Sequence, residues 1–232
     1  MTSITKLLGL RTPPVAVAFL SAPPSGVEKW RGGNVPAGCS FWKAAQEGRV
    51  FYTEPEDHYN CAVGAYTHRI PLPESRANEL NQTVGFMVES GYIRMEEVPS
   101  IPTLAATPAV IAYGPVDRAP FAADVVIVSA KPAQAMLLYE AAARSGAGGA
   151  MPGLGRPACA ALPLALQNGS AAISLGCKGN RTFTGLADDE MYLAFTGPRW
   201  ARVAPQLADI VASNRKMEAH YSAHRGQFAA AP

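Results

Sequence analysis

The stretch AVIAYGPVDRAPFAADVVIVSAKPAQAMLLYEAAAR, residues 109–144, decides the fold class. It opens with two β-branched apolar runs, Ala109–Tyr113 and Asp124–Val128, which are typical of strands inside a sheet. An Ala- and Leu-rich segment from Lys131 to Arg144 follows and predicts a helix. The chain is therefore expected to combine strands and helices.

The segments on both sides continue this alternation. Strands are predicted at 15–20, 50–53, 171–175 and 191–195, and helices at 1–10, 40–47, 73–91, 157–167 and from 198 onward. A connection is expected at 98–108 and a flexible glycine run at 146–155. No βαβ unit of constant length recurs, so a Rossmann fold is disfavoured. We predict an α+β or irregular α/β fold, with a mixed sheet flanked by helices.

A weak internal sequence similarity suggests a duplication within one domain, 1–232, with possible halves 1–107 and 108–232. In each half a cysteine, a helix, a glycine and a strand lead to a second cysteine: Cys39, Gly48 and Cys61, then Cys159, Gly169 and Cys177. A pseudo-twofold arrangement would bring the two cysteine pairs together. Chance matches in an Ala- and Gly-rich chain would give the same pattern.

Composition limits the partners and the compartment. Of the 232 residues 48% are hydrophobic, enough for a substantial core, and 20 basic against 18 acidic side chains leave a charge of only +2. Such a balance does not favour nucleic acid or an anionic membrane, so we expect a small-molecule substrate and a possible homo-oligomer. No export signal or membrane-spanning apolar stretch is present, which predicts a cytoplasmic protein whose four cysteines remain thiols.

The first candidate site is the segment NCAVGAYTH, residues 60–68. It carries a thiol at Cys61, an aromatic ring at Tyr66 and an imidazole at His68. Seven residues on a helix separate Cys61 and His68 by about 10 Å, too far for both to bind one metal ion. A larger cofactor could use both, whereas either residue alone is also typical of packing or capping.

The second candidate is SLGCKGNR, residues 174–181. This predicted turn would present backbone N–H groups, Asn180 and Arg181 to an anion, and its positive charges would activate Cys177. Its ordinary interpretation is a glycine turn with solvated cations. A third segment, GLGRPAC at 153–159, places Arg156 and Cys159 at a predicted helix start, where anions and thiolates are favoured.

Familiar motifs are missing from the sequence. No two cysteines form a C-x-x-C pair, so a zinc signature is absent, and no G-x-S-x-G elbow supports a serine hydrolase. The glycines around Arg156 do not complete a Walker loop.

Taken in order, five blocks resemble the domain-of-unknown-function 169 (DUF169) family over nearly the whole chain. They are PPVAV at 13–17, Cys39 with Trp42 and Ala45, NCAVGAYTH at 60–68, GRPAC at 155–159 and GCKGNR at 176–181. The resemblance implies that the segments of Cys61 and Cys177 matter beyond packing, and that the cysteines share a site. It implies no particular reaction or metal.

The leading functional prediction is an iron-dependent redox protein, a haem oxygenase-type enzyme acting on a small apolar or aromatic substrate. His68 or a cysteine would be the axial ligand, with Arg156 or Arg181 pairing the haem carboxylates. Alternatively, Cys39, Cys61, Cys159 and Cys177 hold an iron–sulfur cluster. A third possibility is a metal-free enzyme with Cys177 as nucleophile and His68 or His58 as base, and a fourth is an anion-binding protein.

Overall fold

The computed structural model describes residues 4–146 and 151–229. One sheet contains seven described strands in the order β2-β3-β1-β4-β7-β6-β5. The strands are β1 (Val15–Leu20), β2 (Phe51–Thr53), β3 (Val110–Pro115), β4 (Val125–Ala130), β5 (Gly153–Leu154), β6 (Ala171–Ser174) and β7 (Met191–Thr196). Only β5 and β6 pair in parallel, and the other neighbours are antiparallel. The prediction of a mixed α/β fold is confirmed.

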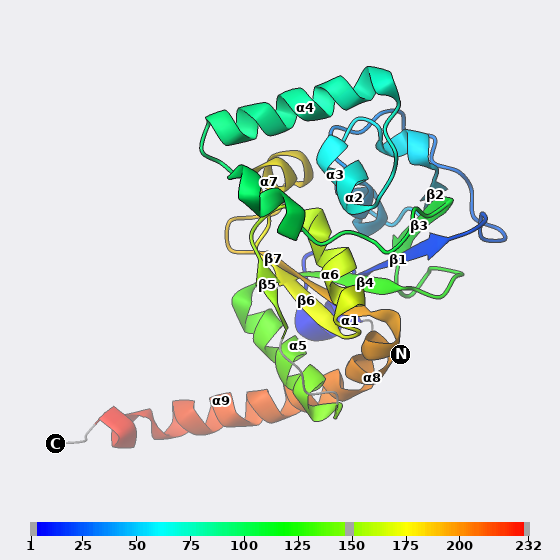
Figure 1. Cartoon of the computed structure of the whole chain (residues 1–232). Coiled ribbons are helices and arrows are strands. Elements are labelled where there is room, and N and C mark those ends of the chain that lie inside the picture. The colour runs from blue at the N-terminus through cyan, green and yellow to red at the C-terminus, as the bar shows by residue number, and fades with distance from the viewer. Residues whose placement is uncertain (1–3, 147–150, 230–232) are drawn as a thin grey trace.

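Helices lie on both faces and at one end of the sheet (Figure 1). The α-helices are α1 (Ile4–Leu8), α2 (Ser40–Gln46), α3 (Ala62–Thr67), α4 (Glu74–Glu89), α5 (Pro132–Arg144), α6 (Ala161–Gln167), α7 (Lys178–Thr184), α8 (Gly197–Val203) and α9 (Leu207–Ala229). Short 3-10 helices are η1 (Pro55–His58), η2 (Met95–Ser100), η3 (Ala158–Ala160) and η4 (Ala204–Gln206).

The sheet separates two hydrophobic cores because side chains alternate along each strand. In β4, Val125 and Ile127 belong to the first core, and Val126 and Val128 to the second. Helices α2 and α6 cover the first core, whereas α1, α5, α8 and α9 cover the second. Since all six residues of β4 are buried, its sequence is apolar except for Ser129 and does not alternate with polar residues.

Helix α4 is set apart from both cores. It lies at the end of the molecule that carries α3 and α7 (Figure 1), and none of its 16 residues is buried. The helix itself is confirmed, with bounds close to the predicted 73–91. Its apolar positions Leu80, Val84 and Met87 are only half-buried, so the periodic pattern does not reflect packing in a core.

Three local predictions are wrong. The predicted turn after Cys177 is the first part of α7, and the predicted glycine run contains β5, with residues 147–150 outside the described part. The last helix divides into α8 and α9, with η4 between them. Pro205 lies in η4 and lacks the N–H that a continuous α-helix requires.

Both predicted halves contribute to the one sheet. Strand β3 lies beyond residue 107, yet it pairs with β1 and β2. The sheet therefore does not divide at residue 107. Among the helices of residues 4–146 and 151–229, none is both long and apolar enough to cross a membrane.

Candidate functional site

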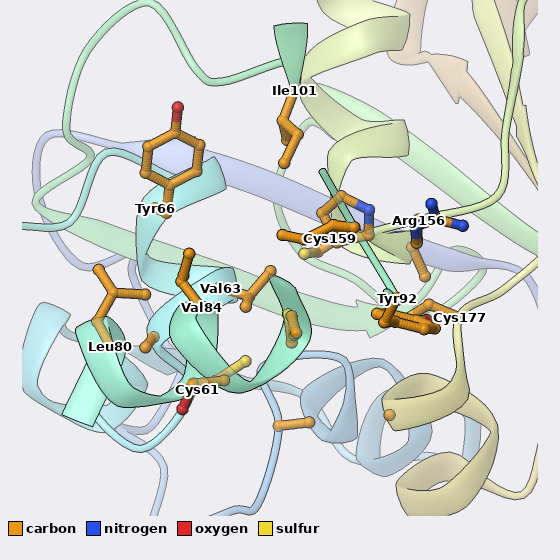
Figure 2. A pocket seen from close by; sticks show the side chains of 18 of the residues that line it. Cys61, Val63, Tyr66, Leu80, Val84, Tyr92, Ile101, Arg156, Cys159 and Cys177 are labelled. Carbon is orange, nitrogen blue, oxygen red and sulfur yellow. The ribbon is translucent and has the colours of Figure 1, made fainter. Parts of the chain in front are cut away.

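A cavity of about 1240 Å³ lies on the side of the first core, between α4 and the starts of α3 and α7 (Figure 2). All four cysteines line it, although 138 positions separate the first, Cys39, from the last, Cys177. Cys39 precedes α2, Cys61 precedes α3, Cys159 lies in η3 before α6, and Cys177 precedes α7. Each of four separate segments therefore contributes one thiol to the wall of the cavity.

Cys61 is held by the first turn of its own helix. Its Sγ accepts a hydrogen bond from the Gly64 N–H at 3.3 Å. A Cβ at position 64 would lie 2.9 Å from this sulfur, closer than such atoms approach. Glycine therefore allows the sulfur to lie directly against the backbone of α3.

Burial keeps the thiols of Cys39, Cys61 and Cys159 protonated. It raises the pKa of Cys39 to about 12, an effect opposed by the Asn180 side chain and increased by charge on Cys61 or Cys177. Burial also raises the pKa of Cys61, and it raises that of Cys159 well above the ordinary value. Charge on Cys177 would raise the pKa of each of the other three thiols, and charge on Cys39 or Cys61 would raise that of Cys159.

The four thiols line one cavity, but they do not converge on a single metal position. In a tetrahedral zinc site, sulfurs 2.3 Å from the metal lie about 3.8 Å apart. Within the described ranges, no three His, Cys, Asp or Glu side chains converge closely enough to hold one metal ion.

His68 is not part of the cavity wall. Its side chain is buried behind α3, with Nδ1 2.7 Å from the Gly64 carbonyl oxygen and the ring beside Phe19 and His58. Burial lowers the pKa of His68, and burial lowers that of His58 to about 3, so both imidazoles are neutral. The predicted roles of His68 as axial ligand and as base receive no support from this position.

Thr67 is a site residue that the sequence did not reveal. Its hydroxyl lies 3.3 Å from Cys159 Sγ and 2.9 Å from the Gly64 carbonyl oxygen. That carbonyl also accepts the backbone N–H of His68 at 3.0 Å and lies 2.7 Å from His68 Nδ1. The Thr67 hydroxyl is therefore within hydrogen-bond distance of both the Gly64 carbonyl oxygen and Cys159 Sγ.

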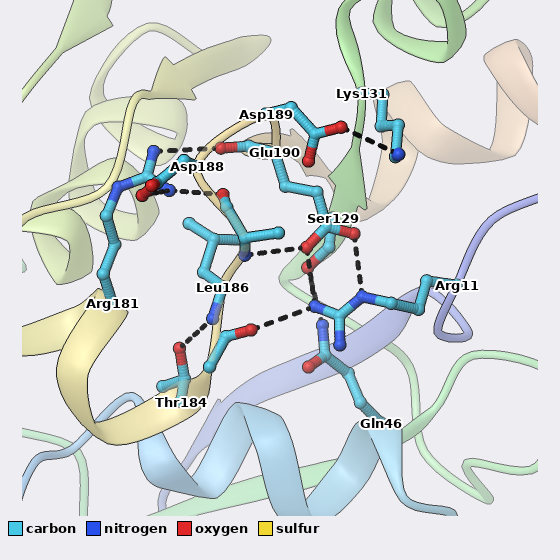
Figure 3. Close-up of polar contacts among 12 residues, drawn as sticks. Arg11, Gln46, Ser129, Lys131, Arg181, Thr184, Leu186, Asp188, Asp189 and Glu190 are labelled. Carbon is cyan, nitrogen blue, oxygen red and sulfur yellow. Dashed lines mark hydrogen bonds and ion pairs between the residues drawn. The ribbon is translucent and has the colours of Figure 1, made fainter.

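The other predicted residues divide into two groups. Tyr66, Arg156 and Asn180 line the cavity, and the Arg156 guanidinium lies 3.3 Å from Glu97 and above the Tyr92 ring. Arg181 does not line it. Its guanidinium donates to the carbonyl oxygens of Leu175, Ala187 and Glu190, so it fixes the loop after α7. Figure 3 shows Arg181 beside Glu190 of this loop.

Fold and site together define a mixed α/β protein with a cavity lined by four cysteines. The sequence matches the model of the DUF169 family, described as uncharacterised ArCR, over residues 3–205. The chain belongs to this family, as its five blocks indicated. Comparisons with curated proteins and with solved structures found no match.

Proposed function

We propose that this protein is a redox protein that holds an iron–sulfur cluster through its four cysteines. The observation that carries the proposal is that Cys39, Cys61, Cys159 and Cys177 all line one cavity. Four thiolates are the usual ligand set of both two-iron and four-iron clusters. When bound, such a cluster supplies one-electron transfer.

The electrostatics of the thiols support a cluster. The thiols of Cys39, Cys61 and Cys159, whose pKa is raised by burial and further by neighbouring cysteines, are unfavourable places for negative charge in the absence of a cation. Iron ions between them would provide that cation and stabilise the thiolates.

Hydrogen bonds to the sulfurs add support. The Thr67 hydroxyl faces Cys159 Sγ and the Gly64 N–H donates to Cys61 Sγ. Donors of this kind stabilise thiolate ligands and set the reduction potential of a cluster. Neither donor is required by a neutral packing cysteine.

The topology supports an internal duplication that pairs the cysteines. If the edge strand β5 is left aside, β2-β3-β1 and β6-β7-β4 each run second, third, first strand of a group toward the middle of the sheet, where β1 and β4 form an antiparallel pair. In each group a cysteine, a helix, a left-handed glycine and a strand precede a second cysteine at a helix start. A twofold axis between β1 and β4 would relate Cys39 to Cys159 and Cys61 to Cys177.

Two other predicted functions are less well supported. A haem would fit the volume, but its axial ligand would have to be a cysteine because His68 lies behind α3. A thiol enzyme that uses Cys177 would lack its predicted base, since neither His58 nor His68 lines the cavity.

An absorption spectrum of protein purified without oxygen separates these functions. We expect broad brown absorption near about 400 nm that bleaches on reduction, whereas a sharp band there indicates haem. Cys61→Ser and Cys177→Ser should each lose most of the absorption and iron. The control Ala62→Ser, which adds a hydroxyl to the same wall, should keep both. A colourless, iron-free protein would contradict the proposal.

A further inference from the structure

The cavity extends well beyond the cysteines, and α4 forms its opposite wall. Leu80, Val84 and Met87 of α4 line it, and all three remain half-buried. An amphipathic helix normally buries its apolar side against protein. Here that side faces the cavity, so a molecule inside the cavity would complete its burial.

The remaining walls suit a neutral molecule with a ring. Tyr66, Tyr92 and Ile101 project around the space (Figure 2). Three charged side chains of the wall form ion pairs, Arg156 and Glu97 with each other at 3.3 Å and Glu79 with Arg76 at 2.7 Å. The fourth, Lys178, is exposed to solvent. The charges of the wall are thus matched or hydrated and do not require a charged ligand.

One buried polar atom in the wall is left without a partner. Asn180 is 1% exposed, and its Nδ2 donates to the Tyr192 hydroxyl at 3.3 Å. Its Oδ1 has no hydrogen-bond partner among the described residues. A buried acceptor of this kind is destabilising unless a donor reaches it. The ligand is therefore expected to carry a hydroxyl or N–H group.

We propose that the cavity binds, beside the four cysteines, a neutral apolar ring compound whose hydroxyl or N–H donates to Asn180 Oδ1. This deepens the proposed function by naming the substrate class of the redox site, although binding itself requires only the cavity. Ligand pockets commonly enclose about 300–1,000 Å³. The cavity of about 1240 Å³ has room for such a compound and a cluster together.

The test uses two probes that differ in one group, 2-naphthol with a hydroxyl and 2-methoxynaphthalene without it. Titration calorimetry of the protein as purified should show 2-naphthol binding about fivefold more tightly or better, because only it satisfies the Asn180 acceptor. Asn180→Leu should remove this preference while 2-methoxynaphthalene still binds.

Substitutions on α4 locate the binding site. Val84→Asp places a carboxylate in the apolar wall and should weaken 2-naphthol binding about tenfold or more. Leu80→Asp should act in the same way and provides an independent check. Gln82→Asp is the control, because residue 82 is exposed on the same helix and does not line the cavity.

Iron measured in the same samples distinguishes the two proposals. Iron-containing protein that does not bind 2-naphthol would overturn the ligand site and leave the cluster intact. Iron-free protein whose binding is sensitive to Val84→Asp would support the ligand site and overturn the cluster. Equal effects of Val84→Asp and Gln82→Asp would place the probe elsewhere and overturn the ligand site.

Discussion

At the scale of the residue, the site depends on which hydrogen-bond donors contact the cysteine sulfurs. Thr67 is fully buried, and its hydroxyl can donate to the Gly64 carbonyl oxygen or to Cys159 Sγ. His68 Nδ1 lies 2.7 Å from the same carbonyl oxygen. The imidazole therefore borders the hydrogen bonds of Cys159 although it lies outside the cavity.

Thr67→Val keeps the shape of the side chain and removes the donor to Cys159. With a cluster bound, the midpoint potential should become more negative by about 40 mV, the equivalent of a hydrogen bond of roughly 1 kcal/mol. Spectroscopic redox titration measures this shift. Thr12→Val is the matched control because Thr12 does not line the cavity. A potential unchanged in Thr67→Val would show that the hydroxyl does not act on the sulfur.

The buried imidazoles predict sensitivity to mild acid. The pKa of His58 is lowered to about 3 from an ordinary value near 6.5, mainly by burial. Between these values the unfolded chain binds a proton that the folded chain does not, so stability decreases as the pH falls. For His58 the loss at pH 5.5 is about 1.4 kcal/mol relative to neutral pH. Denaturant unfolding measured between pH 7.5 and 5.5 should show this loss of unfolding free energy. In His58→Gln the unfolding free energy should depend less on pH over the same range.

At the scale of the element, strong local patterns were sufficient for much of the fold. Strand β1 has its predicted bounds, and α5 begins one residue later than predicted, because apolar runs and turn residues delimit both. Helix α7 was missed since Gly179 and Asn180 disfavour helix in its first turn. The environment of α4 was not predictable, because periodicity cannot distinguish a core from a cavity.

An ion pair anchors the loop after α7 to the segment that follows α1. Arg11 contacts Glu190 at 2.6 Å, and the Glu190 side chain is 3% exposed whereas that of Arg11 is 53% exposed (Figure 3). Arg11→Ala leaves this carboxylate unpaired. We expect a loss of about 1–2 kcal/mol, less than for a fully buried pair because water screens Arg11.

Chemical denaturation measures this loss of unfolding free energy. The control is Arg31→Ala, which removes an ion pair with Glu28 at 3.7 Å whose side chains are 77% and 75% exposed. Its stability should be unchanged, since exposed pairs contribute little. Equal losses in the two variants would show that burial of Glu190 is not the source of the effect.

At the scale of the whole molecule, the sheet brings together site residues that are far apart in the sequence. The cysteines, Tyr66, Arg156 and Asn180 were predicted as site residues from local chemistry, and all of them line the cavity. Arg181 was misplaced because its cationic turn suggested an anion, whereas its guanidinium binds backbone carbonyls. Thr67 and the wall formed by α4 depend on contacts between distant segments, which no local pattern encodes.

The most direct measurement is the content of iron and acid-labile sulfide per chain in protein purified without oxygen. If the four thiols hold a cluster, iron and sulfide should be present in equal amounts, and both should decrease together in Cys159→Ser. Iron without sulfide, or neither of them in folded protein, would contradict the assignment of the cysteine-lined cavity.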